Sequence, residues 1–126
     1  MTTDPFRPAF TDYLREIASW RRRKAEEYDR DVRNLRSAAS LEELAAYVRT
    51  LPEDDARLRE LARLTMAGEA FRPEQRVSYE IGRFRFHYDD TGLDAFLDTL
   101  VELAIADKGE MGRFGGRMPE GDDPWG

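Results

Sequence analysis

The stretch from Val77 to Tyr88 reads VSYEI-GR-FRFHY, and its alternation predicts a β-hairpin. With Gly82-Arg83 at a two-residue turn, apolar or aromatic residues pair across the two strands and fall on one face. The pairs are Ile81 with Phe84, Tyr79 with Phe86 and Val77 with Tyr88. Glycine suits the first central position of a type II′ turn, because that residue needs a positive φ. The sequence therefore predicts one antiparallel hairpin over about residues 76–89, with an aromatic face that helices must cover.

A long first helix is predicted from Phe6 to about Arg36, because apolar residues recur there at spacings of three and four. An unbroken helix of that extent would be about 45 Å long. That is long for so small a domain. We therefore expect this helix either to break near residues 21–24 or to pack its far half on a partner chain.

Capping signals place the other helices. Ser40-Leu-Glu-Glu43 is a capping box, so a second helix is expected to begin there and to end before Pro52. Pro52 suits the first turn of a third helix, with acidic residues at its positive end and Gly68 as its stop. After the hairpin, the stretch Leu93–Ala106 has the cleanest apolar helical face of the chain.

The predicted fold class is α+β and mostly helical, with three N-terminal helices, one hairpin and one C-terminal helix. A length of 126 residues allows one core, so residues 1–108 are expected to form a single domain. Residues 109–126 hold six of the nine glycines and are expected to be a flexible tail. A homodimer is also expected, paired through the hairpin or the first helix.

Composition limits the classes of function. The formal net charge is −6 and there is no cysteine, which excludes disulfides and thiol chemistry. No apolar run approaches the roughly 20 residues of a membrane-spanning helix, and the N-terminal stretch lacks a signal-peptide core, so a soluble cytoplasmic protein is expected. An acidic chain as a whole is not a natural electrostatic partner for nucleic acid or an anionic membrane.

Candidate catalytic and metal-binding groups are few. His87 with Asp89 and Asp90 forms a histidine–carboxylate cluster, but a zinc site needs three or four ligands and the chain has one histidine. A single histidine also argues against a catalytic triad, and no Gly-rich phosphate loop lies between a strand and a helix. We therefore expect no enzymatic activity, no metal and no cofactor.

One basic run, Arg21-Arg-Arg-Lys24, raises a nucleic-acid alternative, either winged-helix-like or mediated by the tail segment 112–117. Its contact residues would be Arg21, Arg22, Arg23, Lys24 and Arg57. Four consecutive helical residues point in four directions, however, so they form no single basic face. The acidic start of the would-be recognition helix and the tight turn of the would-be wing also argue against this alternative.

The tail carries residue types that often supply interface energy: Phe114, Arg117 and Trp125. A mobile segment of this kind can fold onto a partner. We therefore interpret the chain as a non-enzymatic protein–protein interaction module, a small acidic adaptor, inhibitor or regulatory subunit that binds basic partners as a dimer. A third possibility is a small-molecule pocket between the hairpin and the last helix, lined by Tyr79, Phe86 and Phe96.

Overall fold

The computed structural model of the chain describes residues 5–28, 32–87 and 91–110. This part contains five α-helices and one two-stranded antiparallel sheet, which confirms the mostly helical α+β fold class. In chain order the elements are α1 (Phe6–Glu27), α2 (Val32–Thr50), α3 (Ala56–Thr65), β1 (Met66–Ala67), β2 (Ala70–Phe71), α4 (Gln75–Gly82), α5 (Leu93–Ile105) and the π-helical turn η1 (Ala106–Glu110).

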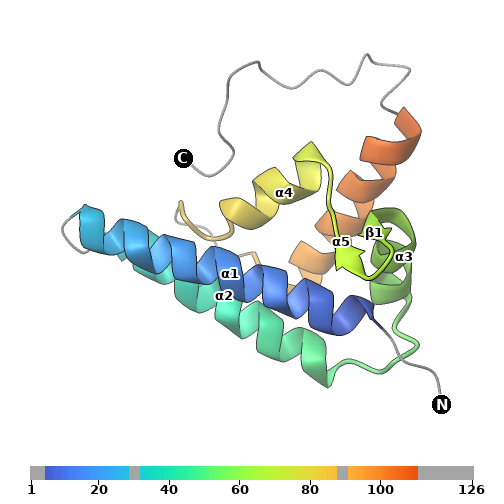
Figure 1. Ribbon diagram of the computed structural model, residues 1–126, viewed down its shortest axis with the longest axis horizontal. Helices are drawn as coiled ribbons and strands as arrows, with labels where there is room; N and C mark the ends of the chain where they lie inside the picture. Colours follow the sequence, from blue (N-terminus) through green and yellow to red (C-terminus); the bar gives the residue numbers. More distant parts are fainter. Residues whose placement is uncertain (1–4, 29–31, 88–90, 111–126) are drawn as a thin grey trace.

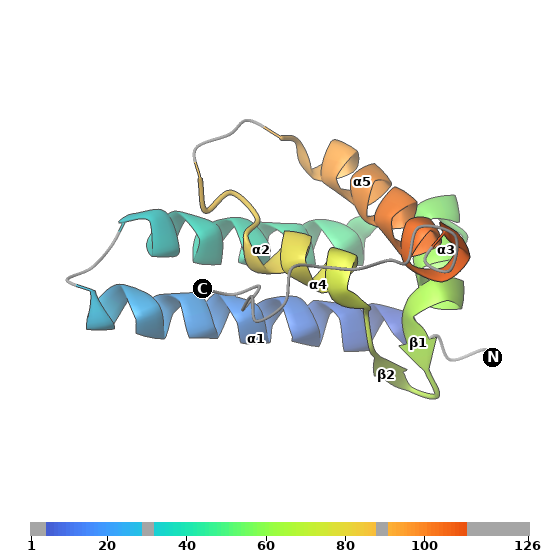
Figure 2. The same cartoon turned by 90° about the horizontal axis from the view of Figure 1, so that it is seen from above.

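The two long helices α1 and α2 run antiparallel, side by side, and form an elongated helical hairpin (Figure 1). Helix α4 lies over the groove between them, while α3 and α5 pack at one end of the pair (Figure 2). We call this covered end, residues 6–18 and 40–50, the proximal end. Residues 19–28 and 32–39 form the distal end, which α3 and α5 do not cover but which the end of α4 and the segment after it contact (Figures 1 and 2).

The core sits at the proximal end because the apolar residues of α1 recur at helical spacing. Four of them lie four residues apart and are at most 2% exposed: Phe6, Phe10, Leu14 and Ala18. They face the buried stripe of α2, and α5 closes the core with Phe96, Leu97 and Leu100. Two of the α1 rings also pack on Phe71 of β2. This burial supplies the main apolar stabilisation of the fold.

The predicted start of the first helix at Phe6 and the predicted end of the second before Pro52 were confirmed, but the boundary between the two helices was wrong. α1 ends at Glu27 rather than breaking at residues 21–24, and α2 begins at Val32, well before the predicted start. Ser40 lies inside α2 and is buried. The Ser-x-x-Glu pattern of a capping box also fits a helix interior, where a small side chain can be buried.

The third helix and the small sheet also differ from expectation. The Asp55 carboxylate caps α3 by accepting from the amides of Arg57 at 3.0 Å and Leu58 at 3.2 Å, so the helix begins after Asp55 rather than at Pro52. Gly68 is not a helix stop but lies in the turn between β1 and β2, with φ of 63°. That left-handed conformation favours glycine. The short hairpin of β1 and β2 was not predicted.

The hairpin predicted at residues 76–89 was wrong, because this stretch begins with helix α4. Val77, Ile81 and Phe84 are buried at spacings of four and three, which is also a helical stripe. The winged-helix alternative therefore has no wing in the described residues of this segment. A homodimer that pairs through this hairpin has no strand edge there either.

The last helix was predicted correctly in place and type. α5 begins at Leu93, and η1 continues it to Glu110, two residues past the predicted end of the domain at residue 108. The remainder of the predicted tail, residues 111–126, lies outside the described residues. Among the helices that the structure describes, none has the length and apolar character needed to cross a membrane.

Candidate functional site

The distal end is built around a buried arginine. Arg21 of α1 is 5% exposed, and its guanidinium donates to the carbonyl of Gly82 from Nε at 3.1 Å and from Nη2 at 2.6 Å. Its Nη1 donates to Oδ1 of the buried Asn34 on α2 at 2.9 Å. One planar side chain thereby joins α1, α2 and the end of α4. Such a fork fixes its own position through several bonds at once.

Two further donors from α2 hold the segment that follows α4. Ser37 donates to the carbonyl of Phe84 at 2.7 Å. Arg36 donates to the carbonyls of Arg85 at 3.0 Å and Phe86 at 2.8 Å. Side chains of the helical hairpin therefore satisfy backbone groups that a strand ladder would otherwise pair. This explains how residues 83–87 can avoid strand structure.

Aromatic rings and cations alternate along the surface of the distal end, in what we call the aromatic–cation ladder. Its members, in spatial order, are Tyr28, Lys24, Trp20, Arg21, Phe86 and Arg33. The Lys24 ammonium lies 5.5 Å from the Tyr28 ring and 5.6 Å from the Trp20 ring. The guanidinium carbon of Arg21 lies 4.6 Å from the Trp20 ring and 4.2 Å from Phe86, which Arg33 approaches at 5.0 Å. These distances are typical of cation–π contacts.

Two large apolar side chains are exposed at the tip of the distal end, one of them the first ring of the ladder. Tyr28, just after α1, is 61% exposed, and Val32, at the start of α2, is 70% exposed. Ile105 on α5, at 44%, is the other large hydrophobic residue exposed in the described part of the chain. Tyr28 and Val32 are therefore the two most exposed large apolar side chains described, and both lie at one end of the molecule.

The distal end is locally basic although the whole chain is acidic. Residues 19–28 and 32–39 contain six cationic side chains and two carboxylates, against a net charge of −6 for the protein. Within this set, Arg22 is bound by Glu42 at 2.5 Å, whereas Arg23 is exposed. The formal charge of these residues is thus positive, although Arg22 and Lys24 are each paired with a carboxylate, Glu42 and Glu27.

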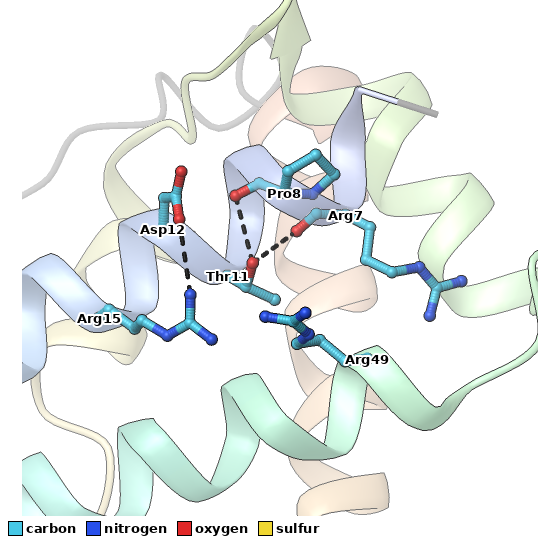
Figure 3. A pocket seen from close by; sticks show the side chains of 6 residues that line it. All are labelled: Arg7, Pro8, Thr11, Asp12, Arg15 and Arg49. Atoms are coloured by element: carbon cyan, nitrogen blue, oxygen red, sulfur yellow. Dashed lines mark hydrogen bonds and ion pairs between the residues drawn. The ribbon is translucent and has the colours of Figure 1, made fainter. Parts of the chain in front are cut away.

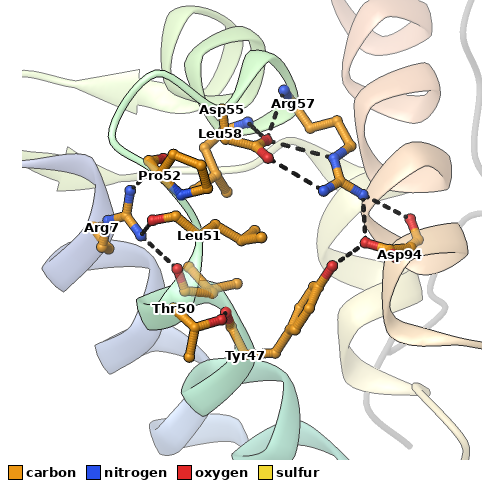
Figure 4. A network of polar contacts seen from close by, with 10 residues as sticks. Arg7, Tyr47, Thr50, Leu51, Pro52, Asp55, Arg57, Leu58 and Asp94 are labelled. Atoms are coloured by element: carbon orange, nitrogen blue, oxygen red, sulfur yellow. Dashed lines mark hydrogen bonds and ion pairs between the residues drawn. The ribbon is translucent and has the colours of Figure 1, made fainter.

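The predicted nucleic-acid contacts are not brought together as one surface. Arg21 is buried, and Arg57 lies at the other end of the molecule in a polar network between α2, α3 and α5 (Figure 4). There Arg57 donates to Asp55 at 3.2 Å and to Asp94 at 2.8 Å. Only Arg22, Arg23 and Lys24 remain near one another at the surface.

Hydrogen bonds within the Arg57 network shift the pKa values of two of its members. Tyr47 donates a hydrogen bond to the Asp94 carboxylate, and this bond raises the pKa of the Tyr47 hydroxyl. The bonds from Tyr47 and Arg57 lower the pKa of Asp94. All these contacts tie helices to one another, so we assign the network a structural role.

The remaining predicted site residues do not form a site in the described part of the chain. His87 is exposed, and its predicted neighbours Asp89 and Asp90 lie outside the described residues. No group of three or more metal-ligating side chains occurs among residues 5–28, 32–87 and 91–110. The proposed pocket beside the last helix is not assembled, because Phe96 stacks on Phe84 at 4.0 Å while Phe86 lies in the ladder. Phe114, Arg117 and Trp125 lie outside the described residues.

Sequence reasoning missed the ladder and the tip as a possible site. A signal was present, because Trp20, Lys24 and Tyr28 are spaced by four and must share one face of a helix. The contribution of Phe86 depends on the path of the chain after α4 and had no such signal. Comparison of the chain with protein-family models, with curated proteins and with solved structures gives no match.

Proposed function

We propose that this protein is a non-enzymatic protein–protein interaction module and that the distal end is its docking surface. The observation that carries this proposal is the exposure of Tyr28 and Val32, 61% and 70%, at the tip of a helical hairpin. Exposed apolar side chains gathered at one place are typical of interaction sites. Tyrosine, tryptophan and arginine are also the residue types that most often dominate interface energies.

The construction of the distal end suits such a role. Arg21 is fixed by hydrogen bonds to Gly82 and Asn34, and it holds the rings of Trp20 and Phe86 in place. Rings that are already positioned lose little conformational freedom when a partner binds. The ladder therefore offers a preorganised surface, which favours binding over a surface of mobile side chains.

The charge of the distal end indicates which kind of protein surface it would bind. The distal end has six cations and two carboxylates, so an acidic partner surface would be attracted to it. The acidic remainder of the chain instead matches the basic partner that the overall charge favours. We propose that the distal end engages an acidic protein surface, and that the tail residues Phe114, Arg117 and Trp125 are a second, separate contact.

The test compares three full-length variants as baits in extract from the source organism. Tyr28→Asp with Val32→Asp changes the tip, Ile105→Asp is the matched control at a distant exposed position, and the third variant replaces Phe114, Arg117 and Trp125 with alanine. Each protein captured by the wild type is purified, and its affinity is measured by calorimetry. We expect the tip variant to lose the partner and the Ile105 variant to keep it, because all three apolar positions are exposed and tolerate charge.

Equal affinity of all baits for every purified partner would contradict a role for the distal end. Loss of binding only in the tail variant would move the docking surface to the tail. Capture of duplex or single-stranded nucleic acid that weakens steeply with salt, and that is lost in Arg23→Glu, would favour the nucleic-acid alternative. Sedimentation of the wild type at micromolar concentration tests the proposed homodimer, now through α1, and a tip variant that becomes monomeric would make the second copy the partner.

A further inference from the structure

A pocket of about 330 Å³ opens at the proximal end, between the first turns of α1 and the last turn of α2 (Figure 3). Its lining residues are Arg7, Pro8, Thr11, Asp12, Arg15 and Arg49. This volume lies at the low end of the range of small-molecule sites. The pocket is remote from the distal end, so its properties are independent of the proposed docking surface.

Arg7 forms a fixed wall of this pocket. Its guanidinium donates to the carbonyls of Val48 at 2.5 Å, Leu51 at 2.7 Å and Pro52 at 3.0 Å (Figure 4). These bonds hold the start of α1 against the end of α2 and use three of the five N–H donors of Arg7. Its positive charge remains next to the pocket, and its guanidinium is fixed in place by these bonds.

Arg49 and Arg15 are the two cations that a ligand could reach. Both guanidinium groups point into the same space, as Figure 3 shows. Arg49 is exposed and makes no hydrogen bond or ion pair with any residue that the structure describes. Arg15 lies 3.7 Å from Asp12, and 49% and 73% of these two side chains are exposed. An ion pair this exposed adds little to stability, so Arg15 can turn to a ligand at small cost.

We propose that this pocket binds the phosphate group of a small phosphorylated molecule. Three guanidinium groups and one carboxylate line it, in a chain whose net charge is −6. The guanidinium fork matches phosphate and carboxylate oxygens. Two forks directed at one space suit phosphate, because its three or four oxygens and its higher negative charge can engage both, whereas a carboxylate offers two oxygens and a single charge.

Substitution of Asp12 provides a test that distinguishes anion binding in this pocket from a purely structural role of its residues. Its carboxylate lines the same pocket and competes for Arg15. Removing that charge should strengthen anion binding, while removing Arg49 should weaken it. Opposite effects of these two residues that exceed the effect of a distant charge change are expected if both face the bound group.

The experiment is calorimetric titration of the full chain with pyrophosphate, and separately with inorganic phosphate and succinate, at constant ionic strength. We expect saturable binding of pyrophosphate, about tenfold or more weaker in Arg49→Ala because a charge-assisted hydrogen bond is lost, and about two- to fivefold tighter in Asp12→Asn. Arg59→Ala is the matched control, since Arg59 is an exposed arginine on α3 whose side chain makes no hydrogen bond or ion pair in the described part of the chain. It should bind like the wild type.

Binding that is absent in the wild type, or equally reduced in the Arg49 and Arg59 variants, would overturn the proposal. Succinate binding as tight as that of pyrophosphate would overturn the preference for phosphate. Thermal unfolding of each variant without ligand shows that the fold is retained. Partner capture by Arg49→Ala should match that of the wild type, which separates failure of this site from failure of the docking surface.

Discussion

The two ends of the α1–α2 pair combine apolar burial with arginine–carbonyl hydrogen bonds, but the large buried apolar side chains lie at the proximal end. At the proximal end, large apolar side chains such as Phe10, Leu14 and Leu41 fill the space between the helices. At the distal end, the buried side chains include Arg21 and Asn34, and their contacts are hydrogen bonds. Apolar side chains stabilise a helix pair whenever their volumes and shapes fit, whereas each hydrogen bond depends on one particular acceptor. We therefore expect the distal end of the α1–α2 pair to depend more on the identity of its residues, and to open more easily, than the proximal end.

The largest effect is expected from a cavity at the proximal end. Phe10 is fully buried, with its ring centroid 5.1 Å from that of Phe6 and 5.0 Å from that of Phe71. Phe10→Ala should lower the free energy of unfolding by about 3–5 kcal/mol, measured by urea denaturation. Phe10→Leu should cost clearly less because most of the volume remains. A loss below about 1 kcal/mol in the alanine variant would show that this cluster is not central to the core.

A smaller loss is expected at the distal end from Arg21→Ala. The carbonyl of Gly82 and the side chain of Asn34 would lose their donor in a buried site, at a cost of about 2–3 kcal/mol in the free energy of unfolding. Arg21→Lys should recover only part of this, because an ammonium group cannot reproduce the fork. Full recovery by lysine would mean that the charge matters and the hydrogen-bond geometry does not.

Ser37→Ala also removes a hydrogen bond at the distal end, with a smaller expected loss in the free energy of unfolding. It removes the hydroxyl that donates to the Phe84 carbonyl at 2.7 Å and changes little volume, so we expect a loss of about 1–2 kcal/mol. Hydrogen exchange should report faster opening of residues 83–87 and unchanged protection in α5. Equal acceleration in both segments would show that the two ends unfold together.

The smallest effect concerns a buried carboxylate that joins η1 to α4. Asp107 is buried, with Nε of Arg76 3.8 Å away. Burial raises the pKa of Asp107 and outweighs the backbone amides of Val77 and Arg76 and the charge of Arg76, which lower it, while the nearby Glu74 acts in the same direction as burial. The folded state then holds the proton more tightly than the unfolded state. This contribution to stability is present below the ordinary aspartate pKa and is lost as the pH rises through the raised one.

Asp107→Asn mimics the protonated form at every pH. We expect it to be slightly more stable than the wild type at pH 7 and equal to it in acid, as measured by thermal unfolding at several pH values. Asp98→Asn is the matched control, because Asp98 is an exposed residue of α5. A destabilised Asp107 variant at pH 7 would show that attraction to Arg76 outweighs the cost of burial.

The parts of the fold that depend on local apolar spacing were predictable. Leu93–Ala106 was predicted as a helix because its stripe is continuous, and α5 follows it closely. The Val77–Tyr88 stretch failed because its residues fit two periods at once: alternate positions suit a strand, while Val77, Ile81 and Phe84 suit a helix. Hydrogen bonds from Ser37 and Arg36, 47 and 50 residues away, and from Arg21, 61 residues away, favour the observed path of the chain, and local patterns carry no information about them.

The residue types of the candidate site were predictable, but which of those residues lie together at the surface was not. The basic run beside Trp20 was identified, yet its first member is buried and its neighbour Arg22 is bound to Glu42. The exposure of Tyr28 and Val32 follows from the fact that neither α3 nor α5 covers the distal end, a property of the tertiary arrangement. The pocket at Arg49 likewise joins residues that are far apart in the sequence.

The hydrogen bonds that side chains of α1 and α2 donate to the carbonyls of residues 82–86 also affect the solubility of the protein. Phe84 and Phe86 belong to a stretch whose alternating aromatic residues have high β-propensity, the composition of segments that pair between chains. Arg83 and Arg85 interrupt it with charge, as gatekeeper residues do. In the native protein, the donors on α1 and α2 occupy the carbonyls that another strand would need. Variants that loosen the distal end should therefore aggregate before they lose helix content.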